Sequence, residues 1–241
     1  MNLDDIRKLH QKKHRDAEGR YLIEGEHLVL ELQKAAANDP RLLSSELYVS
    51  HEYERWQSPF KTHRINSRQM AQITETKAPQ GIAAVVPLLP APAPAADESV
   101  RSIYLYEIQD PGNLGTILRT MAWFGRFRCL LSPGSVDPHN SKVVRASMGA
   151  IFHVPVEIDV ALNSLRPRFE QIACLDLDGE SLNSPAFGQF DCYLFGNEAR
   201  GLPASQLADL AARSFTIAGS RRIDSLNLAA TVNMVLYELN R

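Results

Sequence analysis

One stretch sets the fold of the second half of the chain: Ile103-Tyr-Leu-Tyr-Glu-Ile-Gln-Asp-Pro-Gly-Asn-Leu-Gly-Thr-Ile-Leu-Arg-Thr-Met-Ala-Trp-Phe124. Its apolar start, 103–108, predicts a buried strand, and Pro111 with Gly112 predicts a turn. After the turn, apolar residues recur at the i, i+3, i+4, i+7, i+8 spacing of an amphipathic helix. These residues are Leu114, Ile117, Leu118, Met121 and Ala122.

Further apolar strand candidates alternate with helical patterns beyond this stretch. They are Phe127–Leu131, Ile172–Leu175 and Tyr193–Phe195. Such alternation is typical of a parallel sheet covered by helices on both faces. We therefore predict an α/β domain over residues 99–241.

A proline-rich stretch from Pro87 to Ala96 separates this domain from a smaller one. It holds four prolines in its first eight residues, and such a sequence favours extended polyproline geometry over a sheet. We predict a linker at 87–98 and a first α/β domain at 1–86. Its patterns predict helices at about 4–17, 26–37 and 67–76, and strands at 21–23, 46–50, 62–65 and 81–86.

Composition excludes several classes of protein. The charged fraction is 22 % and the net charge is −2, so no overall charge attracts nucleic acid, and an RNA site must be a local basic patch. No run of about 18 apolar residues indicates a membrane span, and the N-terminal residues lack a signal peptide's apolar segment. The three cysteines are scattered and have no histidine at metal-ligand spacing, which indicates reduced, buried thiols in a cytosolic protein without a metal site.

A second stretch, 193–203, runs from an apolar strand into Gly196, Asn197 and Glu198, and Gly201 closes a tight loop. Glycines let a ligand approach the backbone, whose amides and carbonyls can bind a purine edge. A plain strand-to-helix turn explains the same residues. The chain has neither the GK[ST] of a P-loop nor a GxGxxG, which argues against nucleotide hydrolysis and dinucleotide binding.

A third stretch, 217–227, leads into an apolar helix at 228–239. Asp224 or Ser225 is placed to cap this helix. Because apolar residues occur almost all round it, we expect the helix to be buried, and Asn227 at its first turn then needs a polar partner. The alternative is a purely structural capping role for Ser225 and Asn227.

In this order, the three stretches resemble the SpoU/TrmH family of RNA ribose 2′-O-methyltransferases, part of the SPOUT superfamily. The resemblance covers residues 103–241, and a weaker one relates Lys8–Leu32 to the ribosomal-protein-like RNA-binding domain often fused ahead of this domain. The residues that match the family's patterns are Asn113, Gly115 and Arg119, then Gly196, Asn197, Glu198 and Gly201, then Ser225, Leu226 and Asn227.

The resemblance implies a trefoil-knotted (SPOUT) catalytic domain, a homodimer, and S-adenosylmethionine as the methyl donor. It places Gly196, Asn197, Ile217 and Leu226 at the cofactor, largely through backbone contacts. The partner it implies is rRNA or tRNA rather than DNA. The chain departs from the family in the cofactor loop, where 218–221 reads Ala-Gly-Ser-Arg instead of Pro-Met-x-Gly, and where Ala229 replaces a common serine.

By the same resemblance, Arg119 acts at the ribose 2′-hydroxyl. An arginine almost never loses its proton, so we interpret Arg119 as a clamp on the adjacent phosphate that stabilises the developing alkoxide. Glu198 and Asn227 would orient the ribose or the arginine, and Ser225 and Asn113 would complete the polar shell. No metal is needed.

Basic residues predict where RNA binds. Lys8, Lys12 and Arg15 recur at i, i+4, i+7 on one face of the first predicted helix, with Arg20 nearby. A solvated surface is the alternative for this face. Arg221 and Arg222, in the cofactor loop, are also placed to meet the RNA backbone.

Trp123 lies about 180° from the apolar stripe of its own helix. A large aromatic side chain in that position predicts a second contact surface, such as a subunit interface.

Two other functions stay open. A non-enzymatic RNA-binding or ribosome-assembly protein would explain the departures at 218–221. Base methylation of tRNA by a knotted relative fits the fold but not the pairing of Asn113 with Arg119.

Overall fold

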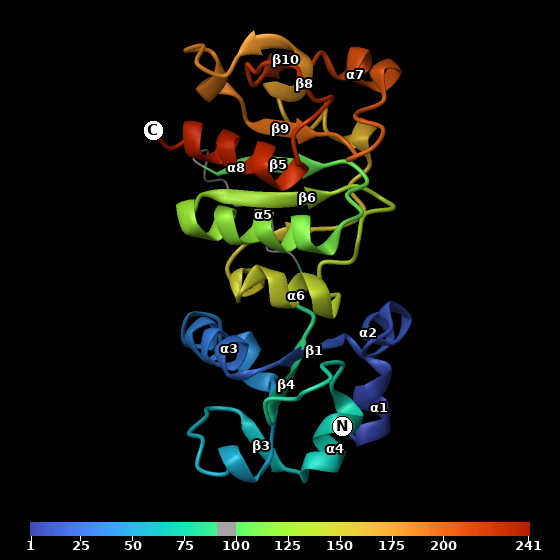
Figure 1. Ribbon diagram of the computed structural model, residues 1–241, viewed down its shortest axis with the longest axis vertical. Coiled ribbons are helices and arrows are strands. Elements are labelled where there is room, and N and C mark those ends of the chain that lie inside the picture. Colours follow the sequence, from blue (N-terminus) through green and yellow to red (C-terminus); the bar gives the residue numbers. More distant parts are fainter. Residues whose placement is uncertain (91–99) are drawn as a thin grey trace. The chain divides into compact units, whose positions relative to one another are not determined.

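The computed structural model describes residues 1–90 and 100–241, which form two compact units (Figure 1). The first unit comprises Met1–Pro90 together with Asp137–His153, and the second holds the other described residues. The segment Asp137–His153 was predicted within the second domain. The predicted linker begins too early, because Pro87 is the last residue of a strand and Leu88 and Leu89 pack against the core of the first unit. Its residues 91–98 lie outside the described residues.

The first unit is built on a four-stranded sheet in the order β1-β4-β2-β3. Neighbouring strands are antiparallel except for β2 and β3, which are parallel. The strands are β1 (Arg20–Glu24), β2 (Glu46–Val49), β3 (Lys61–Arg64) and β4 (Ile82–Pro87). The helices are α1 (Leu3–Lys8), α2 (Lys12–Glu18), α3 (Glu26–Asn38), α4 (Ser67–Ile73) and α6 (Ser141–Ser147), with short 3-10 turns at Pro40–Ser44, His51–Tyr53 and Ala150–Phe152.

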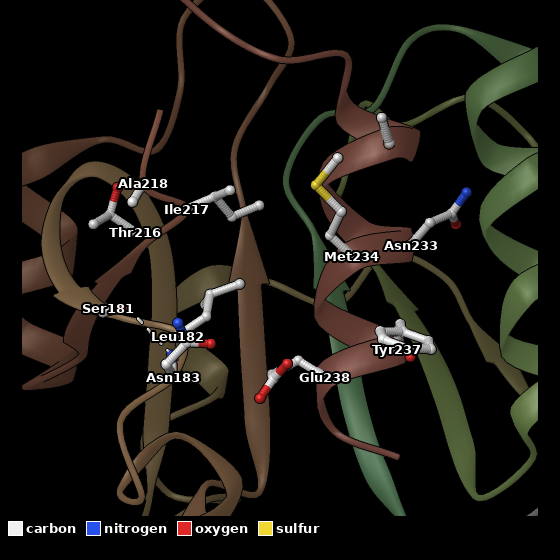
Figure 2. A pocket seen from close by; sticks show the side chains of 11 residues that line it. Ser181, Leu182, Asn183, Thr216, Ile217, Ala218, Asn233, Met234, Tyr237 and Glu238 are labelled. Atoms are coloured by element: carbon white, nitrogen blue, oxygen red, sulfur yellow. Dashed lines mark hydrogen bonds between the residues drawn. The ribbon is translucent and has the colours of Figure 1, made fainter. Parts of the chain in front are cut away.

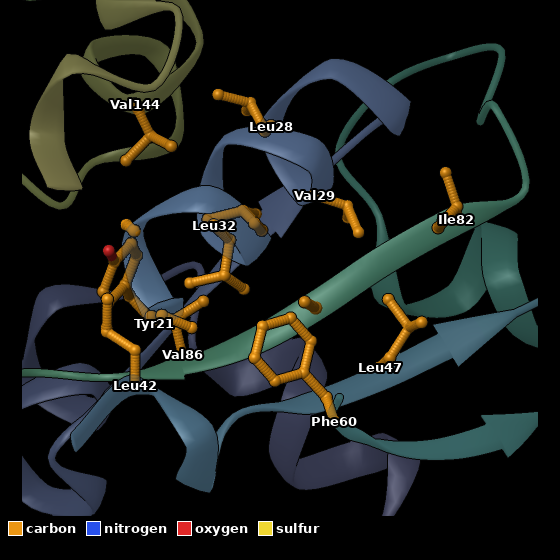
Figure 3. Close-up of a cluster of buried hydrophobic side chains, with 14 of the residues drawn as sticks. Tyr21, Leu28, Val29, Leu32, Leu42, Leu47, Phe60, Ile82, Val86 and Val144 are labelled. Atoms are coloured by element: carbon orange, nitrogen blue, oxygen red, sulfur yellow. The ribbon is translucent and has the colours of Figure 1, made fainter. Parts of the chain in front are cut away.

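Both faces of this sheet are covered by apolar side chains. Successive side chains along a strand point to opposite faces, so alternate residues join different clusters. Along β4, Ile82, Ala84 and Val86 join one apolar cluster, while Ala83 and Val85 join the other. Figure 3 shows the first cluster, in which α3 supplies most of the helical side chains. Val144 of α6 and the half-buried Phe152 belong to the same cluster, which explains why Asp137–His153 packs with the first unit.

The single helix predicted at 4–17 is two helices, α1 and α2. Gln11 has an extended backbone at the break. The cause is the buried side chain of Arg15, whose Nη1 donates to the carbonyls of Leu9 and His10 at 2.8 and 2.9 Å. Because the helix stops after Lys8, these two carbonyls have no helical N–H donor, and Arg15 supplies one instead. The prediction was wrong because this stabilisation depends on burial of Arg15.

The second unit is built on a six-stranded sheet in the order β10-β8-β9-β5-β6-β7, in which every neighbouring pair is parallel. This confirms the predicted parallel α/β class. The strands are β5 (Arg101–Leu105), β6 (Phe127–Leu131), β7 (Val156–Glu157), β8 (Ile172–Ser181), β9 (Cys192–Phe195) and β10 (Arg213–Thr216). The helices are α5 (Pro111–Phe124), α7 (Ala204–Leu210) and α8 (Leu228–Glu238), with 3-10 turns at Leu162–Ser164 and Phe187–Gln189.

Helix α5 forms as predicted and packs against α8 on the same side of the sheet (Figure 1). The apolar residues Leu114, Ile117, Leu118 and Met121 are fully buried. Asp110 caps the helix by accepting from the backbone N–H of Asn113 at 2.7 Å. Opposite the buried stripe, Trp123 is 85 % exposed, as its position predicted.

Helix α8 differs from its prediction in two ways. It is not buried all round, since Met234 and Tyr237 are exposed. Its N-cap is Asn227, whose Oδ1 accepts from the N–H of Ala230 at 3.1 Å, rather than Asp224 or Ser225. The side of α8 that carries Met234 and Tyr237 is therefore only partly covered within the described chain.

Two expectations from composition can be compared with the structure. The three cysteines are free and buried, and burial raises the pKa of the Cys129 thiol to about 12. Among the helices of residues 1–90 and 100–241, none has the length and apolar character needed to cross a bilayer.

Candidate active site

The site lies where parallel strands of the second unit end side by side. Leu105 at the end of β5 pairs with Phe195 at the end of β9. The loops that follow these two strands therefore leave the same edge of the sheet, which is where α/β proteins bind ligands. This register brings the first and second sequence stretches together.

Three polar side chains from the three stretches meet at this edge, and we refer to Asn113, Glu198 and Asn227 as the polar cluster. Nδ2 of Asn113 donates to the Glu198 carboxylate at 3.3 Å, and Nδ2 of Asn227 donates to Oδ1 of Asn113 at 3.0 Å. The backbone N–H groups of Gln109 and Asp110 also donate to Glu198, both at 3.4 Å. The carboxylate is thus held at the N-terminus of α5, where a negative charge is stabilised by the helix dipole.

The loop 196–201 owes its shape to glycines and one asparagine. A Cβ on Gly196 would lie 2.4 Å from the carbonyl carbon of Gly201, so no other residue fits there. Gly201 has a φ of +67°, in the left-handed region that favours glycine. Asn197 is buried: its Nδ2 donates to the carbonyl of Glu107 at 2.8 Å, and its Oδ1 accepts from the N–H groups of Ala199 and Arg200.

The Asn197 side chain therefore shapes the loop, and its backbone does the same, since its N–H donates to the carbonyl of Gly201 at 3.1 Å and its carbonyl accepts from the N–H of Gly201 at 2.9 Å. Loop residue Arg200 pairs with Glu107, which itself has a left-handed backbone. The sequence analysis did not identify Glu107, because its contacts with Asn197 and Arg200 join residues that are about 90 positions apart and leave no local pattern.

The other two predicted catalytic residues are not joined to the polar cluster. Arg119 is exposed on α5 and has no hydrogen bond or ion pair within the described part of the chain. Six residues along a helix correspond to a rise of about 9 Å, which separates it from Asn113. Ser225 is also exposed and is not hydrogen-bonded to any described residue.

Comparison with known proteins adds to this geometry. Residues 101–237 match the SpoU rRNA Methylase family, and residues 2–84 match the MRM3-like substrate binding domain. The chain belongs to the SpoU rRNA Methylase family. The first match covers the polar cluster, both loops and Arg119.

Individual relatives extend along almost the whole chain. The 23S rRNA (guanosine(2553)-2′-O)-methyltransferase RlmP of Bacillus subtilis is 28 % identical over 99 % of this chain and 96 % of its own length. The structure of a TrmH-family RNA methyltransferase from Porphyromonas gingivalis superposes with a TM-score of 0.83 and 28 % identity, covering 99 % of this chain and 96 % of that one. An AdoMet-bound rRNA methyltransferase from Sinorhizobium meliloti superposes with a TM-score of 0.81 and 28 % identity, covering 98 % and 93 %.

In this SpoU-family chain, the third stretch lies against an irregular part of β8. The pairing of β8 with β10 jumps from Cys174 opposite Ser214 to Glu180 opposite Phe215, so residues 175–179 bulge out. Gly179 permits the bulge, because a Cβ there would lie 2.6 Å from the carbonyl oxygen of Ser214. Sequence reasoning missed this bulge, for which Gly179 was the available signal.

Exposed apolar side chains accompany these segments. Leu177 of the bulge and Ile223 and Leu226 of the loop 217–227 are exposed. Several large aliphatic side chains exposed on neighbouring segments indicate a surface that binds a ligand or a partner.

A cavity of about 630 Å³ opens between α8 and the segments 181–183 and 216–218. Figure 2 shows Leu182 and Ile217 facing Met234 and Glu238 of α8 across it. Of the predicted cofactor residues, Ile217 is the one that lines this cavity, and the polar cluster contributes none of its lining.

The basic face predicted in the first unit is not formed as expected. Arg15 is 3 % exposed, and its Nε donates to Asp137 at 3.1 Å, so the prediction that it binds RNA was wrong. Although burial raises the pKa of the Asp137 carboxyl, hydrogen bonds from His139 and Arg15 hold it well below its usual value. The other three cations also have carboxylate partners: Lys8 pairs with Asp5, Lys12 with Asp16 and Arg20 with Glu46.

Proposed function

We propose that this chain is an S-adenosylmethionine-dependent RNA methyltransferase that methylates a ribose 2′-hydroxyl of rRNA or tRNA. The observation that carries the proposal is the polar cluster, in which one residue from each of three distant stretches meets at the carboxyl edge of a parallel sheet. The function named for the B. subtilis relative and the AdoMet bound to the S. meliloti structure support it.

The residues present fit this cofactor. Gly196 lets the backbone of Gly201 pack against it and so keeps the loop compact, and the exposed Leu226 and Ile223 offer apolar surface of the kind that covers an adenine. When bound, the cofactor supplies a methyl group on a sulfonium, a good leaving group for in-line displacement. We assign Gly196, Asn197, Ile217 and Leu226 to it, with Asn197 contributing by holding the loop 196–201 in shape.

The chain's own residues then position the ribose. Arg119 has no partner within the described chain, so its guanidinium is available to a phosphate of the RNA. From there it stabilises the alkoxide that develops as the 2′-hydroxyl loses its proton to phosphate or water. Glu198, Asn113 and Asn227 hold one another and orient the ribose, and Ser225 completes the polar shell.

The organisation of the protein is also part of the proposal. Residues 1–86 bind RNA, with Lys8, Lys12 and Arg20 as contacts, residues 91–98 of the predicted linker connect the domains, and residues 99–241 catalyse within a trefoil knot. The match of residues 2–84 to a substrate binding domain supports the first assignment. We place the enzyme in the cytoplasm with its RNA.

We further propose a homodimer. Trp123 of α5 and Met234 and Tyr237 of α8 are exposed on two helices that pack together, and a second copy would cover them.

The test is transfer of labelled methyl from S-adenosylmethionine to RNA, followed by mass identification of the methylated nucleoside. A 2′-O-methyl nucleoside supports the proposal, whereas a methylated base assigns the chain to base methylation. Cofactor and RNA binding without any transfer would favour the non-enzymatic alternative, which the Ala-Gly-Ser-Arg sequence at 218–221 motivates.

A further inference from the structure

Arg221 adopts a backbone conformation that arginine rarely takes. Its φ is 54°, in the left-handed region, where a side chain other than glycine is strained. The position is the one at which this chain departs from the glycine of Pro-Met-x-Gly. Strain of this kind persists only when other contacts hold the residue in place.

The contacts that hold it come from the bulge of β8. Nη2 of Arg221 donates to the Asp178 carboxylate at 2.7 Å and to the carbonyl of Leu177 at 3.1 Å. The hydroxyl of Thr216 donates to the same carbonyl at 2.9 Å. Both ends of the segment 216–221 are therefore fastened to one point on the bulge.

The fastened segment has little stiffness of its own. Ala218, Gly219 and Ser220 replace the proline-containing sequence of the family, and glycine has more backbone freedom to lose than any other residue. The loop that begins here continues to Leu226 and Asn227, which the proposed function places at the cofactor and in the polar cluster.

We propose that the Arg221–Asp178 pair is a latch that holds the loop 217–227 in its cofactor-binding conformation. Arg221 is thus a positioning residue for S-adenosylmethionine binding, not a contact to RNA. The inference rests on the proposed function, because that function assigns this loop to the cofactor.

The latch has a property that a buried contact would not share. The side chains of Arg221 and Asp178 are 71 % and 85 % exposed, so dissolved ions screen their attraction. Cofactor affinity should therefore weaken as ionic strength rises, and the part of this dependence that arises from the latch should disappear when either partner is removed.

The experiment is calorimetric titration of S-adenosylmethionine into the full-length protein at about 0.05 M and about 0.5 M salt. We expect Arg221→Ala to weaken binding about three- to fivefold at low salt, the range that matches an exposed ion pair, and to match the wild type at high salt. The matched control is Arg213→Ala, which removes the Arg213–Glu180 pair between β10 and β8 without touching the loop. It should bind like the wild type at both salt concentrations.

Two further variants separate the ion pair from the backbone. Arg221→Gly relieves the left-handed strain but keeps no latch, so it should fold at least as well as the wild type and still bind the cofactor as weakly as Arg221→Ala. The reversed pair Arg221→Asp with Asp178→Arg should recover affinity, because aspartate tolerates the left-handed region.

Wild-type affinity in Arg221→Ala or Arg221→Gly at low salt overturns the latch and leaves the proposed function intact. Reduced RNA affinity with unchanged cofactor affinity also overturns it, and assigns Arg221 to RNA instead. A wild-type protein that does not bind S-adenosylmethionine overturns the latch and the proposed function together.

Discussion

Arg119 in the second unit and Arg15 in the first unit are both helical arginines in basic or polar surroundings, yet the protein uses them in opposite ways. Arg119 is exposed and has no partner within the described chain, and it lies on the same helix as Asn113, whose polar cluster is already hydrogen-bonded within itself. Arg15 is buried and bonded to Asp137, Leu9 and His10. An arginine whose donors are all unused can act on a ligand, whereas one whose donors are used internally stabilises the fold.

The first test of this contrast is to replace Arg15, for which we expect the largest change, a loss of folding stability. Arg15→Ala should destabilise the protein by about 3–5 kcal/mol, because it leaves the largely buried Asp137 carboxylate without its arginine partner. Chemical denaturation measures this loss. Lys34→Ala, which removes the exposed Lys34–Glu31 pair in the same unit, is the control and should change the free energy of unfolding by less than about 1 kcal/mol. Equal small losses would show that Arg15 is not structural.

The same pair predicts a dependence on pH. The folded pKa of Asp137 lies below its ordinary value of 3.8, so its contribution to stability is complete above that pH and is lost as the pH falls below it. In Asp137→Asn this contribution is absent. Unfolding measured from neutral to acid pH should therefore show a smaller acid-side loss in the variant than in the wild type.

The next largest effect is expected for Arg119, whose replacement should change the rate of methyl transfer. Arg119→Ala should lower kcat about a hundredfold or more, since loss of one preorganised charged donor costs about 3 kcal/mol in the transition state. Arg119→Lys should recover little, because an ammonium cannot reproduce the planar guanidinium. The assay is single-turnover methylation beside cofactor titration of the same protein. Near-normal turnover in the alanine variant would falsify the assignment, and loss of cofactor binding would make Arg119 a structural residue.

The sequence predicted the two arginines unequally well for a physical reason. Around Arg119, the apolar stripe of α5, the Asp110 cap and the Pro111–Gly112 turn are local signals, and they fix the helix and its exposed face. The role of Arg15 depends on Asp137, which is 122 residues away. No spacing within 4–17 reveals that partner, so the helical periodicity placed Arg15 on the exposed face with Lys8 and Lys12, whereas Arg15 is buried.

The same distinction explains the rest of the fold. Strands β5, β6 and β9 are apolar and were predicted, whereas β10 has one large apolar residue, Phe215, and β7 has two residues in all. The polar cluster joins residues that are 85 and 114 positions apart. Family resemblance named its members, but the hydrogen bonds between Asn113, Glu198 and Asn227 follow only from strand register.

A smaller change should follow from Trp123→Glu. If α5 and α8 form a subunit interface, the variant must bury a carboxylate there, and desolvation of that charge opposes association. We expect the wild type to sediment as a dimer at micromolar concentration and the variant as a monomer. A monomeric wild type would remove the interface, and with it the explanation for the exposed Trp123.

The smallest effect is expected for the RNA contacts of the first unit. Removing that unit is a poor test, because Asp137–His153 packs into it and Val144 would lose its apolar surroundings. The double variant Lys8→Ala and Lys12→Ala is better, since both side chains lie on the surface of short helices. Because Asp5 and Asp16 already pair with these lysines, each phosphate contact must compete with a carboxylate. We therefore expect RNA affinity to fall only about two- to fivefold, and the slope of log affinity against log salt to fall by about 1 to 2.

The matched control is again Lys34→Ala, which removes an exposed lysine with a carboxylate partner from a helix that carries no proposed contact. Its RNA affinity and salt slope should equal those of the wild type. If the double variant also keeps the wild-type affinity and slope, the first two helices do not bind RNA. Lys8 and Lys12 would then resemble Arg15, in that their ion pairs serve the protein itself and not RNA. The RNA contacts of the first unit would have to come from another surface.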